Sequence, residues 1–214
     1  MFNNNAIYLS HFINEKTPLY GGKQNQISFD NLSSINGGDT SNSMLVKFPN
    51  HTGTHIDFPL HFSNNGKSIN DYPPDFWLYE KIGFINCNVS KINQELKNLP
   101  SDIEFLIIKT GFEKNRGKVR YWKNQPILKS ELAKKFRSKF QKLRAIGFDM
   151  ISLTSKLDRD EGKKAHIEFL INENILIIED MSLSKLIITP KKLYVFPTLI
   201  DKADGSPCTI IATF

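Results

Sequence analysis

Three of the five histidines in this 214-residue chain lie within the eleven-residue segment HTGTHIDFPLH, which runs from His51 to His61. Histidine binds metal ions and carries protons near neutral pH, and Asp57 adds an anionic oxygen to the group. A mixture of imidazole and carboxylate suits Zn²⁺ or Mn²⁺ better than Ca²⁺, which takes only oxygen ligands. The alternative is a polar loop whose histidines are hydrogen-bonded surface groups. The clustering favours a metal site.

The spacing within this segment indicates how its side chains meet. Gly53 and Pro59 disfavour a helix. In an extended chain, His55 and Asp57 point to the same side of the strand. A tight bend at Gly53 would bring His51 back beside them. The segment is therefore expected to form a strand whose ligands share one face.

The same eleven residues closely resemble the signature of the cyclase superfamily of metal-dependent hydrolases, which includes bacterial kynurenine formamidase and isatin hydrolase. Weaker similarities extend over most of the chain. They comprise Leu9–His11, Thr17–Gly21, Thr110–Phe112, Gly147–Asp149, His166 with Phe169–Glu179, and Asp204–Pro207. Two positions depart from the family pattern: Lys23 stands where an acid is usual, and Cys208 follows Pro207 where the block often continues with Arg.

The resemblance implies an α/β domain over residues 1–214, of the cyclase (swivelling β/β/α) type, with two divalent metal ions, zinc or manganese. It assigns His51, His55 and Asp57 to one ion, with Asp57 also reaching the other. It assigns His166 to the second ion and Glu179 to both, His61 to acid/base catalysis and Tyr20 to substrate binding. The implied reaction is hydrolysis of an amide-type C–N bond, in a formamide or a cyclic amide, by a metal-bound hydroxide. The resemblance also implies a homodimer or homotetramer.

The residues themselves support a ligand at Glu179, which ends the apolar run 175–178. A carboxylate is costly to bury there without a partner, and a metal ion would supply one. Glu173 and Asp180 are competing candidates. The remaining histidine, His11, falls in an expected strand and is interpreted as a structural residue.

Short β-branched and apolar runs alternate with helical patterns along the chain. We expect strands over residues 8–13, 44–48, 81–89, 105–110, 145–149, 175–178, 193–197 and 209–213. We expect helices over about 90–99, 130–144 and 161–172, the second with an apolar stripe formed by Leu132, Phe136, Phe140 and Leu143. No linker divides the sequence. The pattern predicts one α/β domain with a mixed sheet and flanking helices.

The formal net charge of +6 is unevenly distributed. Residues 114–144 hold twelve Lys or Arg and one acid, and the remaining chain has a net charge of −5. Arg116, Tyr121 and Trp122 belong to a stretch in which bases and aromatics alternate, as in single-strand binders. The later lysines lie opposite the apolar stripe, which is typical of a solvated helix face. We expect no nucleic-acid partner. The alternative function is a non-catalytic metal-binding protein that docks onto a partner through residues 114–144.

Aromatic side chains near the histidine motif favour a small, flat or aromatic substrate, although core packing accounts for each of them more simply. They are Tyr20, Phe58, Phe62, Tyr72, Phe76 and Trp77. The first residues show no signal-peptide pattern, and no stretch approaches 18 apolar residues. Cys87 and Cys208 have no zinc or disulfide-framework spacing. We therefore expect a cytoplasmic protein without a membrane span.

Overall fold

Four parallel strands form one part of the main sheet in the computed structural model, which describes residues 5–153 and 155–214. They are β6 (Ile82–Asn86), β7 (Phe105–Lys109), β8 (Ala145–Phe148) and β9 (Leu176–Glu179). Every residue of β8 and β9 is buried. Parallel strands covered on both faces have continuous apolar sequences, which is why these runs show no polar alternation.

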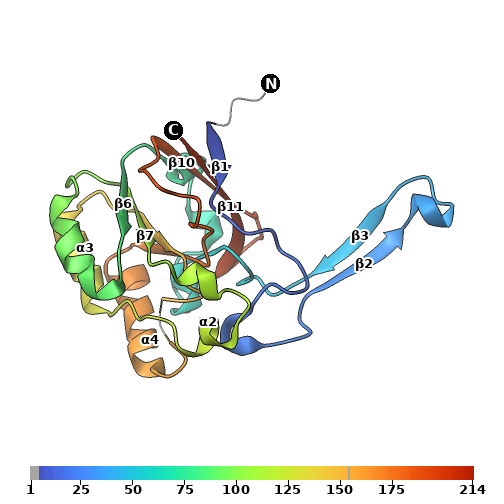
Figure 1. The fold of residues 1–214 in the computed structure, drawn as a ribbon, viewed down its shortest axis with the longest axis horizontal. Helices are drawn as coiled ribbons and strands as arrows, with labels where there is room; N and C mark the ends of the chain where they lie inside the picture. Colours follow the sequence, from blue (N-terminus) through green and yellow to red (C-terminus); the bar gives the residue numbers. More distant parts are fainter. Residues whose placement is uncertain (1–4, 154) are drawn as a thin grey trace.

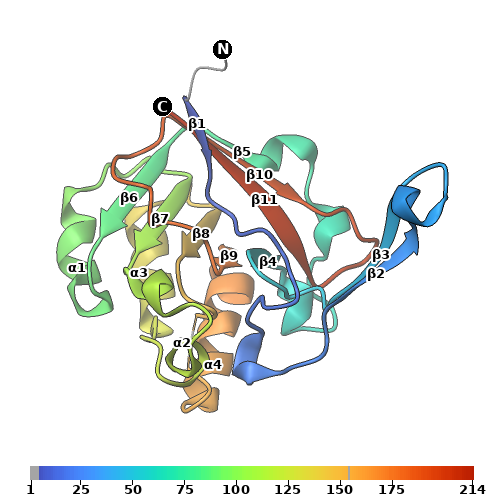
Figure 2. The ribbon, with the colours of Figure 1, turned by 45° about the vertical axis from the view of Figure 1, so that its right-hand side comes forward.

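Antiparallel strands extend the sheet beyond β9. They are β4 (His55–Asp57), β11 (Gly205–Thr213), β10 (Lys192–Pro197), β5 (Leu78–Tyr79) and β1 (Ala6–Tyr8). The strand order is β5-β10-β11-β4-β9-β8-β7-β6, and β1 pairs with β11 (Figure 2). The short strand β4 therefore joins the parallel and antiparallel parts of the sheet, with β9 on one side and β11 on the other.

Helices flank the parallel strands (Figure 1). The α-helices are α1 (Ile92–Glu95), α2 (Val119–Lys123), α3 (Glu131–Lys139) and α4 (Arg159–His166), which continues as a π-helical segment, Ile167–Asn172. Short 3-10 helices span Tyr20–Gly22, Ile35–Gly37, Pro59–His61, Ile69–Asp71, Pro74–Trp77, Val89–Lys91, Leu96–Asn98 and Phe112–Asn115. Phe136 of α3 packs edge-on against Phe169, with 5.7 Å between ring centroids. This contact joins α3 to the segment that follows α4.

A separate two-stranded sheet projects from the body of the protein (Figure 1). It consists of β2 (Ser28–Ser33) and β3 (Ser43–Lys47), which we call the hairpin arm. Leu32, Met44 and Leu45 in this arm are 67%, 57% and 52% exposed. In the part of the chain that the structure describes, these apolar side chains have no third strand or second layer to pack against. An isolated two-stranded hairpin of this kind is only marginally stable in water.

The predicted fold class, one α/β domain with a mixed sheet and flanking helices, is confirmed, and the strands expected over 81–89, 105–110, 145–149 and 175–178 overlap β6–β9. The strand expected over 8–13 was wrong, because β1 ends at Tyr8. Beyond it, a side-chain hydroxyl replaces the strand ladder: the backbone N–H of Ile210 donates to Ser10 Oγ at 3.2 Å.

The helix expected over 130–144 was too long, since α3 ends at Lys139. The guanidinium of Arg137 donates to the carbonyls of Phe140, Gln141 and Leu143 and so holds the chain in a non-helical turn. The first strand of the hairpin arm, Ser28–Ser33, the short strand β5 and helix α2 were not anticipated.

Cys87 and Cys208 are free thiols, as their spacing indicated. Across residues 5–153 and 155–214, no helix is both long and apolar enough to cross a membrane. The interpretation of the first residues as lacking a signal peptide concerns Met1–Asn4, which lie outside the described residues.

Candidate metal centre and active site

The histidine motif folds as its spacing predicted. Gly53 has a left-handed backbone conformation, with φ of 64°, which only glycine adopts without strain. The turn brings His51 to within 2.8 Å of Asp57, measured from Nδ1 to Oδ1. His55 and Asp57 then begin and end β4, and His55 lies opposite Glu179 in the antiparallel pairing of β4 with β9. The sheet register therefore brings together ligand candidates that lie 124 residues apart in the sequence.

Two of the histidines are held in one tautomer by backbone carbonyls. Nδ1 of His55 lies 2.8 Å from the carbonyl oxygen of Gly53, and Nδ1 of His166 lies 2.7 Å from that of Gly162. A carbonyl oxygen only accepts, so each Nδ1 carries the proton and donates it. Each Nε2 is left with a free lone pair directed at the carboxylates, which is the arrangement that metal-binding histidines require.

The distances between these nitrogens and the two carboxylates fit shared metal ligands better than hydrogen bonds. Nε2 of His55 lies 3.6 Å from Asp57 and 3.6 Å from Glu179, and Nε2 of His166 lies 3.8 Å and 3.6 Å from the same two carboxylates. Two ligand atoms each about 2.1 Å from one ion in tetrahedral geometry lie about 3.4 Å apart. Within the described residues, His51, His55 and Asp57 form one group with metal-ligand spacing, and Asp57, His166 and Glu179 form another. Asp57 belongs to both groups.

The carboxylates of this cluster are buried, which destabilises the folded protein unless a cation pairs with them. Asp57 and Glu179 are 1% and 4% exposed, and an isolated buried carboxylate is strongly destabilising. Burial raises the pKa of Asp57, but the hydrogen bond and positive charge of His51 outweigh it and hold the pKa well below its usual range. The donor chemistry, the burial and the fixed tautomers all fit a divalent cation.

His51 is held differently from the other two histidines. Its Nδ1 contacts Asp57 and its Nε2 lies 3.1 Å from Asp204 Oδ2, so both ring nitrogens donate to carboxylates. Burial lowers the pKa of His51, but these two hydrogen bonds outweigh it and raise the pKa to about 9. A metal ion at His51 must therefore displace a proton.

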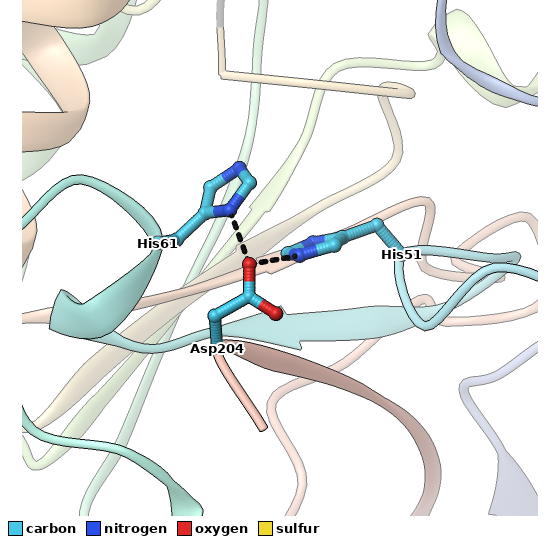
Figure 3. A group of neighbouring side chains, drawn as sticks. All are labelled: His51, His61 and Asp204. Atoms are coloured by element: carbon cyan, nitrogen blue, oxygen red, sulfur yellow. Dashed lines mark hydrogen bonds and ion pairs between the residues drawn. The ribbon is translucent and has the colours of Figure 1, made fainter. Parts of the chain in front are cut away.

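His61 and Asp204 form a pair beside the cluster (Figure 3). Nδ1 of His61 lies 2.7 Å from Asp204 Oδ2, and the ring of His61 packs against that of His51 with 4.1 Å between centroids. Asp204 receives a further hydrogen bond from Asn50 at 2.6 Å. Sequence reasoning noted the Asp204–Pro207 block but gave Asp204 no role. Its pairing with His61 depends on a strand contact that only the fold provides.

The cluster forms the floor of a cavity of about 500 Å³, a size suited to a small molecule. His61 and Tyr20 both line this cavity, and so does Phe62, whose ring stacks on His166 at 4.5 Å. Burial raises the pKa of Tyr20, so its hydroxyl stays protonated over a wide pH range. Two of the aromatic side chains near the motif therefore face the cavity.

The other four aromatic residues near the motif pack against each other in the hydrophobic core; they are Phe58, Tyr72, Phe76 and Trp77. His11 lies outside the cavity, and its ring Nε2 is 3.7 Å from Glu113. Of the competitors to Glu179, Asp180 forms an ion pair with Arg116 at 2.8 Å, and Glu173 is half-buried and does not line the cavity. Glu179 is therefore the carboxylate of this segment that faces the cavity.

The first part of the basic segment folds against the body of the protein. Tyr121 is fully buried, and its hydroxyl donates to Asp180 at 2.5 Å. Arg116 donates to the same carboxylate. In α3, by contrast, Lys134 and Lys135 are exposed opposite the buried apolar stripe, as the sequence pattern predicted. The segment thus combines an internal ion-pair cluster with a solvated helix face.

Comparisons with known proteins agree with this geometry. Residues 7–155 match the model of the cyclase family, described as "Putative cyclase". The chain is 31% identical over 183 residues to a kynurenine formamidase of Bacillus mycoides, which covers 84% of this chain and 81% of that protein. Isatin hydrolase A from Labrenzia aggregata superimposes with a TM-score of 0.78 at 17% identity, over 98% of this chain and 94% of that one. A potential metal-dependent hydrolase with cyclase activity gives a TM-score of 0.73 at 19% identity, over 97% and 96% of the two chains.

The chain belongs to the cyclase family of metal-dependent hydrolases, as the histidine motif indicated. Its cyclase-type fold is likewise confirmed. Within this family the chain is an amidohydrolase, and its His, Asp and Glu cluster fits divalent metal binding.

Proposed function

We propose that this protein hydrolyses an amide-type C–N bond in a small formamide or cyclic amide, with two divalent ions, zinc or manganese, in its active site. His51, His55 and Asp57 would hold one ion, and Asp57, His166 and Glu179 the other. Bound metal ions would supply an activated water and polarise the amide carbonyl. The observation that carries this proposal is that both ligand groups share Asp57 while His61 lies beside them, paired with Asp204.

His61 is proposed as the acid/base residue. Its Nδ1 donates to Asp204, which leaves Nε2 as the nitrogen able to accept a proton. In the first step Nε2 takes a proton from the attacking water, whose oxygen bonds to the carbonyl carbon. The C–N bond then breaks, and Nε2 returns the proton to the departing nitrogen. The products are a carboxylic acid and an amine, or a ring-opened amino acid from a cyclic amide.

Tyr20 and Phe62 are proposed to contact the substrate. Both line the cavity, and Phe62 covers one face of His166. The kynurenine formamidase and isatin hydrolase relatives are named for aromatic substrates, and the two rings here would suit a flat group.

The test is metal analysis of the purified protein together with a hydrolysis panel of formamides, lactams and lactones. We expect two divalent ions per chain and turnover of at least one formamide or cyclic amide. His61→Ala should retain metal while turnover falls by about two to four orders of magnitude, the usual contribution of a positioned acid/base. Less than one ion per chain would refute the two-metal site, and unchanged turnover in His61→Ala would refute the role of His61.

The second candidate, a non-catalytic metal protein that docks through residues 114–144, would be favoured by metal content without hydrolysis across the panel. The burial of Tyr121 and the pairing of Arg116 with Asp180 make the first part of that segment structural. We also propose that residues 1–214 act as one hydrolase domain in the cytoplasm.

We further propose a homodimer or homotetramer in which the hairpin arm packs on a second copy of this chain. Its exposed Leu32, Met44 and Leu45 support this assembly. Replacing Leu32 and Leu45 by Ser should shift the mass measured by light scattering to that of one chain, and an unchanged mass would refute a contact through the arm.

A further inference from the structure

The cavity carries three positively charged side chains beyond the proposed metal ligands. Lys23, Arg159 and Lys163 all line it. The lining carboxylates, Asp57 and Glu179, both belong to the ligand cluster. Over residues 5–153 and 155–214, none of the three bases forms an ion pair or a side-chain hydrogen bond within the protein. The cavity therefore presents unneutralised positive charge to whatever enters it.

Helix α4 places two of these bases on the same face as a proposed ligand. Arg159, Gly162, Lys163 and His166 line the cavity, and their spacing of i, i+3, i+4 and i+7 defines one side of a helix. His166 lies at the floor with the carboxylates, and the bases precede it along the axis. Gly162 has no side chain, so the wall between them stays open.

Two acidic residues at the start of α4 are engaged elsewhere, and a third, Asp160, is exposed and does not line the cavity. Asp158 caps the helix and accepts from the backbone N–H of Glu161 at 3.2 Å. The Glu161 carboxylate accepts from the backbone N–H of Ser130 at 2.6 Å. Neither acid lines the cavity. The helix thus directs Arg159 and Lys163 toward the cavity and keeps these acids away from it.

Positive side chains beside a divalent-cation site repel the cations electrostatically and gain nothing from them. They are exposed to solvent, and an anion that enters the cavity is attracted to them and replaces water as their partner. Arg159 guanidinium and Lys163 ammonium groups match a carboxylate in charge and hydrogen-bonding geometry.

We propose that the substrate of this hydrolase carries a carboxylate, bound by Arg159 and Lys163 with Lys23 approaching from the turn after Tyr20. This inference rests on the proposed amide hydrolysis. Lys163 and Arg159 precede His166 by three and seven residues, or about 4.5 and 10 Å along the helix axis. The carboxylate therefore lies roughly 5–10 Å from the amide carbonyl that reacts at the floor.

The experiment compares two probes of equal shape, 4-formamidobenzoate and its neutral carboxamide, 4-formamidobenzamide. In the wild-type protein we expect kcat/KM to be about tenfold higher or more for the carboxylate, because a charge-assisted hydrogen bond at a partly exposed site has about this effect. In the double variant Arg159→Gln/Lys163→Gln this ratio should fall toward one. The matched control is Lys164→Gln, which removes an exposed charge of α4 that does not line the cavity and should leave the ratio unchanged.

Binding supplies a second readout that does not depend on turnover. Calorimetry with 4-aminobenzoate and 4-aminobenzamide should show the same preference for the carboxylate and its loss in the double variant. Equal kcat/KM for both formamides, or a ratio unchanged in the double variant, would overturn the carboxylate site while leaving amide hydrolysis standing. Preferential binding of 4-aminobenzoate without hydrolysis of either formamide would overturn the proposed reaction and support the carboxylate site.

Discussion

Replacing Asp204 by Asn removes the charge that faces His61 while it preserves the shape of the side chain. In the native protein one carboxylate oxygen, Oδ2, accepts from His61 at 2.7 Å and from His51 at 3.1 Å. The other oxygen, Oδ1, accepts from Asn50 at 2.6 Å. An amide has only one accepting atom, so it satisfies either the histidines or Asn50.

The size of the effect follows from these contacts. If the amide NH₂ faces His61, it donates to Nδ1, and Nε2 then carries the proton and cannot act as a base. If the amide oxygen faces His61, the tautomer survives, but the imidazolium loses its counter-charge. Hydrogen bonds to charged groups contribute about 1.5–3 kcal/mol, and the side chains of His61 and Asp204 are 33% and 38% exposed, so we take the lower end. We therefore expect kcat to fall about tenfold.

The assay is steady-state hydrolysis of whichever formamide or cyclic amide the panel identifies, with the metal content measured on the same samples. Asp201→Asn is the matched control, because Asp201 lies three residues earlier and contacts Asn70 rather than a histidine. Asp204→Asn should also have no further effect in the His61→Ala background, because the two residues act as one unit.

Two results would refute this reasoning. One is an unchanged kcat in Asp204→Asn. The other is an equal loss with and without His61, which would mean that Asp204 acts on something else. Loss of metal in Asp204→Asn would identify that target as His51, the other histidine bound to the carboxylate.

Three other perturbations address the metal centre. Asp57→Asn should remove both ions, because Asp57 belongs to both ligand groups; elemental analysis measures this, and retention of two ions would contradict it. Gly205→Ala should weaken metal binding about tenfold to hundredfold in a metal titration, because a methyl group at this position would overlap the His51 ring. Gly37→Ala is the control, since its added methyl group meets only Ser34. Equal metal affinities of the two variants would contradict the prediction. The apparent metal affinity should rise between pH 6.5 and 9 as His51 loses its proton, with proton release detected by calorimetry in buffers of different ionisation enthalpy. In the metal-free protein, the raised pKa of His51 contributes folding stability that is complete below about pH 6.5 and is lost as the pH rises through about 9. The Tm of the metal-free protein should therefore fall across this pH range. The fall in Tm should be smaller in His51→Gln.

Local patterns predicted the parts of the fold in which the hydrophobic effect acts over consecutive residues. The continuous apolar runs of β7–β9 are buried as expected, because strands covered on both faces need apolar residues throughout. Leu132 and Phe136 of α3 are buried because their spacing matches one face of a helix. The hairpin arm was only partly anticipated. Its first strand, Ser28–Ser33, mixes polar and apolar residues without the alternation that marks a half-buried strand.

The histidine motif also determined its own geometry, since a left-handed glycine and a two-residue spacing place His51, His55 and Asp57 together within one short segment. The sequence indicated Glu179 as a buried carboxylate ligand, but it left Glu173 and Asp180 as competing candidates. The pairing of His55 with Glu179 in adjacent strands, and the ion pair of Asp180 with Arg116, distinguish these acids.

The sequence by itself thus indicated the residues that we propose as metal ligands, because that chemistry depends on residue types brought together by local backbone geometry. Only the tertiary structure decided what surrounds them. Asp204 reaches His61 because the pairing of β4 with β11 is followed by a hydrogen bond from the backbone N–H of Phe58 to the carbonyl of Asp204. Lys23 and the two bases of α4 line one cavity, although they lie more than 130 residues apart in the sequence. Contacts between segments this far apart depend on sheet register and helix packing, which the spacing of residues within a single segment does not specify.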